Sequence, residues 1–427
     1  MIKKYNLKTF FKWFYPGMRV KRWALLSLLG IVLIMIGVFG MTRIPSDLSI
    51  IITYVYYTNV IIGIILIILG FKNMMVSVVT LLMPHKEGHL IDIMYQKRFL
   101  EHGPKIVVIG GGTGLSVLLH GIKEYTSNIA AIVTVADDGG SSGRLRQQFD
   151  IVAPGDIRNC LVALAADETM MRELFQYRFK QETEFSGHSF GNLFITAMTQ
   201  VTGDFEKAIK ESSKVLSIRG RVLPSTLEKV TLVAEHKDGR VTHGEAQIPK
   251  AGSPIAKIFI RPQDASAAPD AVKAIREAEL IILGPGSLYT SIIPNLLIKE
   301  IRDAVAEAQV SKIYVCNIMT QRGETDRFKA SDHIKELITH THPKIMDACV
   351  VNVGRIPSAM LEKYAGENSI PVEADSQTIK DFGYGVIEDD LVSATDLVRH
   401  DANKLARIIA HLLNLEKRAG GNSASDA

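Results

Sequence analysis

Two long apolar stretches lie near the start of the chain, at residues 23–41 and 48–71. Each is long enough to cross a bilayer as a helix, which takes about 20 mostly apolar residues. Basic residues are frequent before the first stretch and return after the second, whereas the connector at residues 42–47 carries a single one, Arg43. By the positive-inside rule, this charge pattern predicts a membrane hairpin with both ends in the cytoplasm. A signal peptide is the alternative for the first stretch, but no small-residue cleavage pattern follows it.

The pattern changes after residue 104, where short aliphatic runs begin to alternate with amphipathic segments. This alternation predicts an α/β fold, a parallel sheet with helices on both of its faces. Around residues 222–261, two runs that flank an Asp238-Gly239 turn predict a β-hairpin, which would form a small antiparallel insertion. The predicted strands of the parallel sheet are residues 105–109, 129–135, 280–283, 312–315 and 348–353.

These patterns divide the chain into four parts. Residues 1–71 form the membrane anchor, residues 72–104 a juxtamembrane linker with short helices at the membrane surface, and residues 105–415 the α/β domain. Residues 416–427 are rich in Gly, Ser, Asn and Ala, and we expect this tail to be disordered.

Composition and charge narrow the classes of function. The chain has 427 residues, too many for one ordinary domain, and its formal net charge of +4 lies mostly at the N-terminus. This distribution does not suggest a nucleic-acid-binding protein, which usually carries a concentrated basic face. Cys160, Cys316 and Cys349 are widely separated, which favours reduced, buried thiols in a cytoplasmic domain over a zinc site or disulfides.

A glycine-rich loop follows the first predicted strand and leads into a helix at residues 115–125. Backbone N–H groups at the start of such a helix are suited to bind a phosphate. Leu115 stands where a strict dinucleotide-binding fingerprint has its third glycine, so a tight turn without a ligand is the alternative. The residues of this loop are Gly110, Gly111, Gly112, Thr113 and Gly114.

The loop after the second predicted strand begins with two carboxylates, Asp137 and Asp138. Adjacent carboxylates can hold a ribose hydroxyl or a Mg²⁺ ion, and the glycines, serines and arginine that follow suit phosphate oxygens. A capped loop with solvated acids is the alternative. The phosphate-binding candidates are Gly139, Gly140, Ser141, Ser142 and Arg144.

Two further polar segments are candidates for the substrate side of the site. The first contains Asp156, which is either a third metal candidate or the N-cap of the helix that carries Cys160. The second contains His188, which is either an acid or base or a hydrogen-bonded structural residue. The substrate-side candidates in these segments are Arg158, Asn159, His188, Ser189 and Asn192.

Three segments nearer the C-terminus complete the set of candidates. In the segment that follows residues 280–283, glycines allow the backbone to approach a ligand closely. Hydroxyl groups in this segment can contact the ligand, and an aromatic ring can stack on a base. After residues 312–315, neutral amides and hydroxyls fit a base edge or a sugar better than a metal. Arg399 can reach a pyrophosphate or lie on a solvated face, and Asp401 is expected to be an N-cap. The candidates in the first two segments are Gly284, Gly286, Ser287, Tyr289, Thr290, Asn317, Thr320, Gln321 and Glu324.

In an open α/β sheet, ligands bind beyond the carboxyl ends of the strands, and these loops follow predicted strands. Because several polar or glycine-rich loops follow the strands of one sheet, we expect them to form one convergent site for a diphosphate-containing nucleotide. The chain has no Walker motif, which argues against nucleotide hydrolysis by that mechanism, and these loops contain no recognisable nucleophile with an obvious base.

Seven motifs occur in order along the α/β domain: VVIGGGTGLSVLL, VTVADDGGSSGRLR, PGDIRNCLVALA, GHSFGNLF, LGPGSLYTSIIPNLL, VCNIMTQRGETD and LVRHD. Together they resemble the gluconeogenesis factor family (YvcK-like proteins), which is related to the CofD-like 2-phospho-L-lactate transferases. The likeness covers about residues 104–415. It leaves out the N-terminal hairpin, which departs from the soluble character of typical members.

The resemblance implies a Rossmann-like fold in a self-associated protein that binds UDP-sugars, UDP-GlcNAc or UDP-glucose. It also implies a role in cell shape and cell-wall synthesis during growth on gluconeogenic carbon sources. Carried over by motif, residues 110–114 and 284–291 would hold nucleotide or phosphate, and Asp137, Asp138 and Asp156 would be the Mg²⁺ candidates. The hairpin would tether such a protein to the inner membrane face, where nucleotide sugars meet lipid carriers.

Three functions compete. The first is a regulator that senses a UDP-sugar and acts through a cell-wall synthesis protein. The second is a transferase that passes a phospholactyl-type group from a nucleoside diphosphate donor to a deazaflavin acceptor with the help of a divalent metal. The absence of an obvious acid–base pair and the closer likeness to the regulatory family favour the first. The third, an NAD-dependent dehydrogenase, is disfavoured by Leu115 and by the phosphate-binding character of the loop at residues 139–144.

Overall fold

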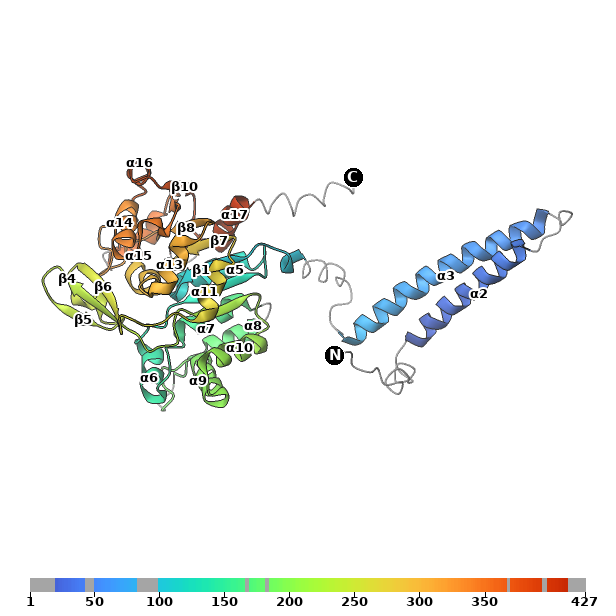
Figure 1. Cartoon of the computed structure of the whole chain (residues 1–427), viewed down its shortest axis with the longest axis horizontal. Coiled ribbons are helices and arrows are strands. Elements are labelled where there is room, and N and C mark those ends of the chain that lie inside the picture. The colour runs from blue at the N-terminus through green and yellow to red at the C-terminus, as the bar shows by residue number, and fades with distance from the viewer. Residues whose placement is uncertain are drawn as a thin grey trace. The chain divides into compact units, whose positions relative to one another are not determined.

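The chain forms two compact units, Met1–Lys97 and Arg98–Ala427 (Figure 1). The structure, a computed structural model, describes residues 20–42, 50–82, 99–165, 169–180, 184–366, 369–393 and 398–413. The predicted disordered tail at residues 416–427 and most of the predicted linker lie outside the described residues.

The first unit is a hairpin of two apolar helices, α2 (Val20–Thr42) and α3 (Ile50–Leu82). Glycines let the two backbones approach closely: a Cβ at Gly30 would lie 2.6 Å from the carbonyl oxygen of Gly63, and the converse distance is also 2.6 Å. By length and composition both helices can cross a membrane, and most of their large apolar side chains are exposed. Helix α3 extends to Leu82, beyond the predicted end of the second span at residue 71, so the linker begins as helix.

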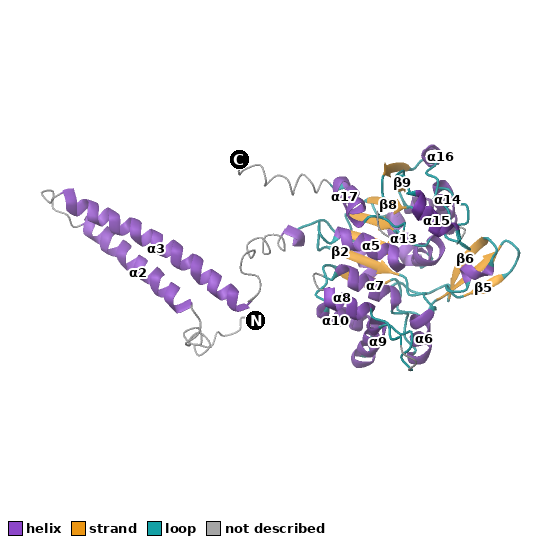
Figure 2. Cartoon of the chain, turned by 180° about the vertical axis from the view of Figure 1, so that it is seen from behind, coloured by secondary structure: helices purple, strands orange, loops and turns teal. Residues whose placement is uncertain are grey.

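The second unit is built on a seven-stranded parallel sheet with the strand order β10-β9-β8-β7-β1-β2-β3. Helices cover both faces, because α5 packs against α7 and α17 while α11 packs against α13 (Figure 2). The predicted fold class is therefore confirmed. The strands are β1 (Ile106–Gly110), β2 (Ile129–Val133), β3 (Arg221–Pro224), β7 (Leu280–Leu283), β8 (Ser311–Val315), β9 (Ala348–Asn352) and β10 (Gly385–Asp389).

Helices and short helical turns connect these strands. Those that surround the site are α5 (Gly112–Ile122), α6 (Gly140–Phe149), α7 (Gly155–Leu164), α8 (Thr169–Gln176), α9 (Phe190–Thr202), α15 (Ser358–Ala365), α17 (Ala402–Leu412) and η3 (Leu288–Ile292). The others are α10 (Phe205–Val215), α11 (Pro269–Arg276), α12 (Ile293–Leu296), α13 (Lys299–Glu307), α14 (Ala330–His340), α16 (Ser376–Asp381), η2 (Ile248–Ala251) and η4 (Pro343–Ile345).

The antiparallel insertion is a separate small sheet with the order β5-β4-β6. Its strands are β4 (Thr231–His236), β5 (Val241–His243) and β6 (Ile255–Arg261), and Gly239 forms the predicted turn with φ +84°. The predicted start of the insertion at residue 222 is wrong, because Arg221–Pro224 pairs in parallel with β2. That strand is short and lies at the edge of the main sheet, so its pattern gives a weak signal.

Capping differs between the helices that begin at the carboxyl ends of the strands. The Asp401 side chain accepts hydrogen bonds from the amides of Asn403 and Lys404, which confirms its predicted role as the N-cap of α17. By contrast, α5, α6 and α7 have no hydrogen bond from the side chain of their N-cap residue. Three helix N-termini with exposed or weakly paired N–H groups therefore lie around one edge of the sheet.

Candidate functional site

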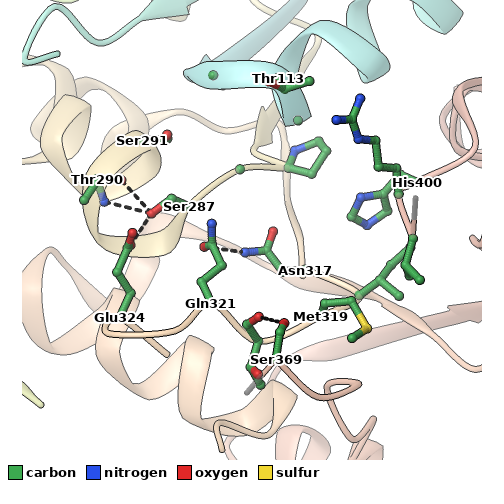
Figure 3. A pocket seen from close by; sticks show the side chains of 18 of the residues that line it. Thr113, Ser287, Thr290, Ser291, Asn317, Met319, Gln321, Glu324, Ser369 and His400 are labelled. Carbon is green, nitrogen blue, oxygen red and sulfur yellow. Dashed lines mark hydrogen bonds between the residues drawn. The ribbon is translucent and has the colours of Figure 1, made fainter. Parts of the chain in front are cut away.

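A cavity of about 600 Å³ lies beyond the carboxyl ends of β1, β7 and β8. Figure 3 shows the side chains that surround it. They come from the glycine-rich loop after β1, the serine-rich segment after β7, the polar segment after β8, and residues 398–400. The structure thus brings together four of the segments singled out in the sequence.

The glycine-rich loop forms one wall of this cavity at the start of α5. The N–H of Gly112 donates to the carboxylate of Asp156, and the amides of Thr113 and Gly114 have no partner within the helix because they belong to its first turn. A Cβ at Gly114 would lie 2.8 Å from the carbonyl oxygen of Pro285, so glycine is required there for close packing. This wall therefore has the geometry with which a helix N-terminus can accept an anion, as the sequence predicted.

A buried hydrogen-bonded group lies below it (Figure 3). The Ser287 hydroxyl donates to Glu324 and accepts from the Thr290 hydroxyl at 2.7 Å and from the Thr290 amide at 3.2 Å. Burial raises the pKa of Glu324 to about 7. Since a serine hydroxyl has one hydrogen to donate and two lone pairs, all of its capacity is used here. Ser287 is therefore a structural member of the cavity rather than a free nucleophile.

Neutral polar groups form the opposite wall. The Asn317 side-chain nitrogen donates to the Gln321 side-chain oxygen at 3.2 Å, and Figure 3 shows both amides beneath the cavity. Thr320 is buried, and its hydroxyl accepts from the amide of Ile370 at 2.9 Å. Amides of this kind match the edge of a base or the hydroxyls of a sugar.

His400 contributes a neutral imidazole. Its Nε2–H donates to the carbonyl oxygen of Cys316 at 3.0 Å, and burial lowers its pKa to about 4. The other ring nitrogen is consequently an acceptor at neutral pH. Arg399 is exposed and lines the same cavity, so the predicted alternative of a purely solvated face does not apply.

The aromatic ring that lines the cavity is not the predicted one. Tyr289 is 1% exposed and packs against Phe328 and His340, with ring centroids 6.4 Å and 5.7 Å away, so it cannot stack on a ligand. The cavity is lined instead by Tyr364 of α15, whose hydroxyl accepts from the amide of Val398 at 3.1 Å. Gly110 ends β1, Gly284 directly follows β7, and neither lines the cavity.

A second cavity of about 290 Å³ lies beyond β2, between α6, α7 and α9. The candidates Asp137, Asp156, Arg158, Asn159 and Asn192 line it together with residues 139–142. The predicted single convergent site is thus two neighbouring cavities.

Arg144, His188 and Ser189 are further predicted site residues that line neither cavity. Arg144 is exposed and donates to the carbonyl oxygen of Ser186 at 2.7 Å. His188 is buried, with its Nδ1 3.0 Å from the Ser141 hydroxyl, and Ser189 is the N-cap of α9. Burial, together with Arg144, lowers the pKa of His188. These three residues support the wall of the second cavity. For His188, this agrees with the predicted alternative of a hydrogen-bonded structural residue.

Carboxylates lie between the two cavities. Burial and the nearby charge of Asp137 raise the pKa of Asp156 to about 7. Pro154, not Asp156, is the N-cap of α7, and no side-chain cap forms there, so the predicted capping role of Asp156 is wrong. Its carboxylate instead faces the start of α5.

The insertion supplies a further carboxylate, Glu245, which the sequence did not single out. Glu245 lines the first cavity and is hydrogen-bonded to Asp137, and burial and that carboxylate raise its pKa well above its usual range. Asp138 positions this segment, since it accepts from the amide of Ala246 at 3.0 Å. Asp138 lines neither cavity, and its role as a metal ligand stays a prediction.

The carboxylates fit a metal only in part. Within the described ranges, no group of three or more His, Cys, Asp or Glu side chains could hold a metal ion. Mg²⁺ is often bound by one or two carboxylates together with ligand phosphates, and Asp137 and Asp156 could supply those. The Mg²⁺ site stays a prediction.

Replacing Glu245 with glutamine is expected to stabilise the protein by at least about 1 kcal/mol at pH 8 and by less at pH 5. A carboxyl group whose pKa is higher in the folded state than in the unfolded state lowers the stability of the fold only at pH values above its unfolded-state pKa. This loss of stability grows with pH until the pH reaches the folded-state pKa. Thermal unfolding at both pH values measures the effect. Glu235→Gln, at an exposed position on β4, is the matched control and should change little. An equal gain at pH 5 and pH 8 would contradict the assignment.

Comparisons with known proteins agree with this architecture. The family described as 2-phospho-L-lactate transferase CofD matches residues 106–392. A "Gluconeogenesis factor" from Bacillus subtilis (strain 168) is 49% identical over 73% of this chain and 98% of its own length. A solved structure from Bacillus halodurans, a member of the UPF0052 family, has a TM-score of 0.70 and 47% identity, and the match covers 72% of this chain and 99% of that one. A chain of this kind thus folds without the hairpin.

The match to one longer relative extends beyond the α/β domain. A "Putative gluconeogenesis factor" from Nostoc sp. (strain PCC 7120 / SAG 25.82 / UTEX 2576) is 46% identical over 95% of this chain and 93% of its own length. Because Arg98–Ala427 makes up about three quarters of the chain, that match includes part of the N-terminal unit. The likeness therefore reaches beyond residues 104–415.

Proposed function

Since this chain belongs to the CofD family and within it is a relative of the gluconeogenesis factors, we propose that it is a UDP-sugar-binding regulatory protein. Its ligand would be UDP-GlcNAc or UDP-glucose, and its output the regulation of cell shape and cell-wall synthesis during gluconeogenic growth through a partner protein. We also propose self-association of the α/β unit, which sedimentation in detergent would measure.

The observation that supports this proposal best is that the two walls of the first cavity differ in chemistry. One wall offers first-turn amides of α5, with Arg399 at the rim, and these suit a diphosphate. The other offers neutral groups, Asn317, Gln321 and His400, which suit a base and a sugar. The volume of about 600 Å³ lies in the range of small-molecule sites.

The chemistry of the walls favours binding over turnover. The Ser287 hydroxyl is fully hydrogen-bonded, and His400 is held neutral with one nitrogen committed to a backbone carbonyl. Ser287 does donate to a carboxylate, Glu324, but Thr290 occupies both lone pairs of its oxygen, so neither that oxygen nor Nε2 of His400 is free to attack a ligand.

A transferase is the second candidate, and one observation favours it. Asp137, Asp156 and Glu245 lie beside the cavity, where carboxylates and a divalent metal could assist transfer of a phospholactyl-type group to a deazaflavin acceptor. This candidate predicts metal-dependent release of a nucleoside monophosphate, because the transferred group takes one of the two phosphates of the donor with it, and this release should be lost in Asp137→Asn.

Phosphorus NMR of the full-length protein in detergent with UDP-GlcNAc and Mg²⁺ tests whether the protein binds a nucleotide sugar without breaking it. We expect the signals of the nucleotide sugar to stay unchanged for hours while a thermal shift reports binding, because the cavity provides no leaving-group chemistry. Appearance of UDP or UMP would contradict the regulatory assignment. A boiled sample is the control for non-enzymatic breakdown.

A further inference from the structure

The second cavity contains a buried arginine whose charge is not matched by a contacting acid. Arg158 is 8% exposed, and its guanidinium donates to neutral oxygens of Ser189 at 2.6 Å, Asn192 at 3.1 Å and Asn159 at 2.6 Å. Its Nε is buried and has no hydrogen-bond partner among the described residues. Arg158 also forms no ion pair within the part of the chain that the structure describes.

A buried charge with neutral partners alone is costly, by several kcal/mol. A second arginine adds to that cost: burial and the nearby Arg178 lower the pKa of Arg158, and Arg178 lines the same cavity. Arg178 is exposed at the rim, where it donates to the carbonyl oxygen of Gly187 at 2.9 Å. Asp137 and Asp156 line the same cavity and oppose this lowering of the pKa of Arg158, but neither forms an ion pair with Arg158, so an acceptor that contacts both arginines directly would complete the cavity.

The remaining walls suit the same anion. Helix α6 begins at the cavity, and its N-cap, Gly139, provides no side-chain acceptor for the first-turn amides. Gly140 has φ +45°, and a Cβ there would meet nothing within 4 Å, so the backbone is open to a ligand. Ser142 adds a hydroxyl group at the same end of the helix.

We propose that this second cavity is a separate site for a phosphate monoester, which is held by Arg158, Arg178 and the first-turn amides of α6. A tetrahedral phosphate has enough acceptor oxygens to satisfy donors from two arginines and a helix N-terminus at once. The cavity, about 290 Å³, is too small for a whole nucleotide sugar, so its ligand is a second, smaller molecule. Asp156 lines this cavity and its carboxylate accepts from the N–H of Gly112, so it closes the side toward the first cavity.

The test is a calorimetric titration of inorganic phosphate into the full-length protein in detergent, with the first cavity saturated by UDP-GlcNAc. We expect binding that Arg178→Gln weakens about tenfold or more, since hydrogen bonds to charged groups contribute about 1.5–3 kcal/mol. Arg158→Lys, which keeps the charge but loses the planar fork, should also weaken it. Arg172→Gln, at an exposed position on α8 that does not line the cavity, is the control.

Each outcome decides the proposal. Absence of phosphate binding, or equal binding in the native protein, Arg178→Gln and Arg158→Lys, overturns it. Competition between phosphate and UDP-GlcNAc also overturns it, because phosphate would then occupy the first cavity. The affinity for UDP-GlcNAc should be unchanged in Arg178→Gln, so a failure of this site and a failure of the nucleotide-sugar site are distinguishable. If UDP-GlcNAc itself does not bind, phosphate is titrated alone. Weaker phosphate binding in Arg178→Gln and Arg158→Lys than in the native protein then supports the proposal, and equal binding overturns it.

Discussion

The Gly112→Ala variant is expected to bind a UDP-sugar about 10-fold to 100-fold more weakly than the native protein. A Cβ at Gly112 would have one neighbour within 4 Å, the Ser291 hydroxyl at 3.5 Å, and both residues line the first cavity. The added methyl group would therefore point to where a phosphate approaches the amides of α5. Losing one hydrogen bond to a charged group, which contributes about 1.5–3 kcal/mol, gives this range. Calorimetric titration measures it.

Gly203→Ala is the matched control for backbone strain. Gly112 has φ +66° and Gly203 φ +69°, and a Cβ at Gly203 would meet nothing within 4 Å. Alanine in this conformation costs about 1–2 kcal/mol of stability at either position. Gly203 ends α9 and lines neither cavity, so its variant should be equally destabilised and bind normally. Normal binding by Gly112→Ala would show that no phosphate lies at the start of α5.

Removal of residues 1–97 is expected to move the protein from the membrane fraction to the soluble fraction. The side chains of Leu25, Ile51 and Phe71 are 68%, 72% and 58% exposed on the hairpin. Burial of one such side chain stabilises by about 1.5–3 kcal/mol, so two helices covered with them partition strongly into lipid. Fractionation of cells that express either form, followed by an alkaline wash, measures the effect.

Detergent provides the control for this experiment. The full-length protein should leave the membrane pellet in detergent but not in high salt, because apolar surface rather than charge holds it there. Full-length protein in the soluble fraction would contradict the assignment of a membrane anchor. The cytoplasmic orientation of both ends stays a prediction, which labelling of a cysteine introduced at Ser46 in the connector would test.

The central part of the fold could be predicted because its strands are buried on both faces. Strands β1 and β7 are fully buried and read as uninterrupted aliphatic runs, as expected for parallel strands between two layers of helices. The edge strand β10 has the sequence GVIED and is largely exposed or half-buried, so it carries no such run. The hairpin insertion was visible from its turn, whereas its third strand, β6, pairs with β4 across many residues and gives no local signal.

The site was predictable at the level of loops and less so at the level of side chains. The loops lie at the carboxyl ends of the strands whatever their detailed conformation, but the direction of a side chain depends on the turn that carries it. Tyr289 stands beside residues that line the cavity, yet η3 directs its ring into the core. Glu245 and Tyr364 reach the cavity from an insertion and from a distant helix, and neither stands in a motif.

Calorimetric titration of the α/β unit, residues 98–427, with UDP-GlcNAc, UDP-glucose, GDP and NAD, each with and without Mg²⁺, tests whether the first cavity is a metal-independent site for a UDP-sugar. We expect selective binding of a UDP-sugar that survives removal of the metal. This binding should be weaker in Arg399→Ala, because the Arg399 side chain lines the first cavity. Binding of GDP that depends on Mg²⁺, with no signal from either UDP-sugar, would contradict it and favour the transferase.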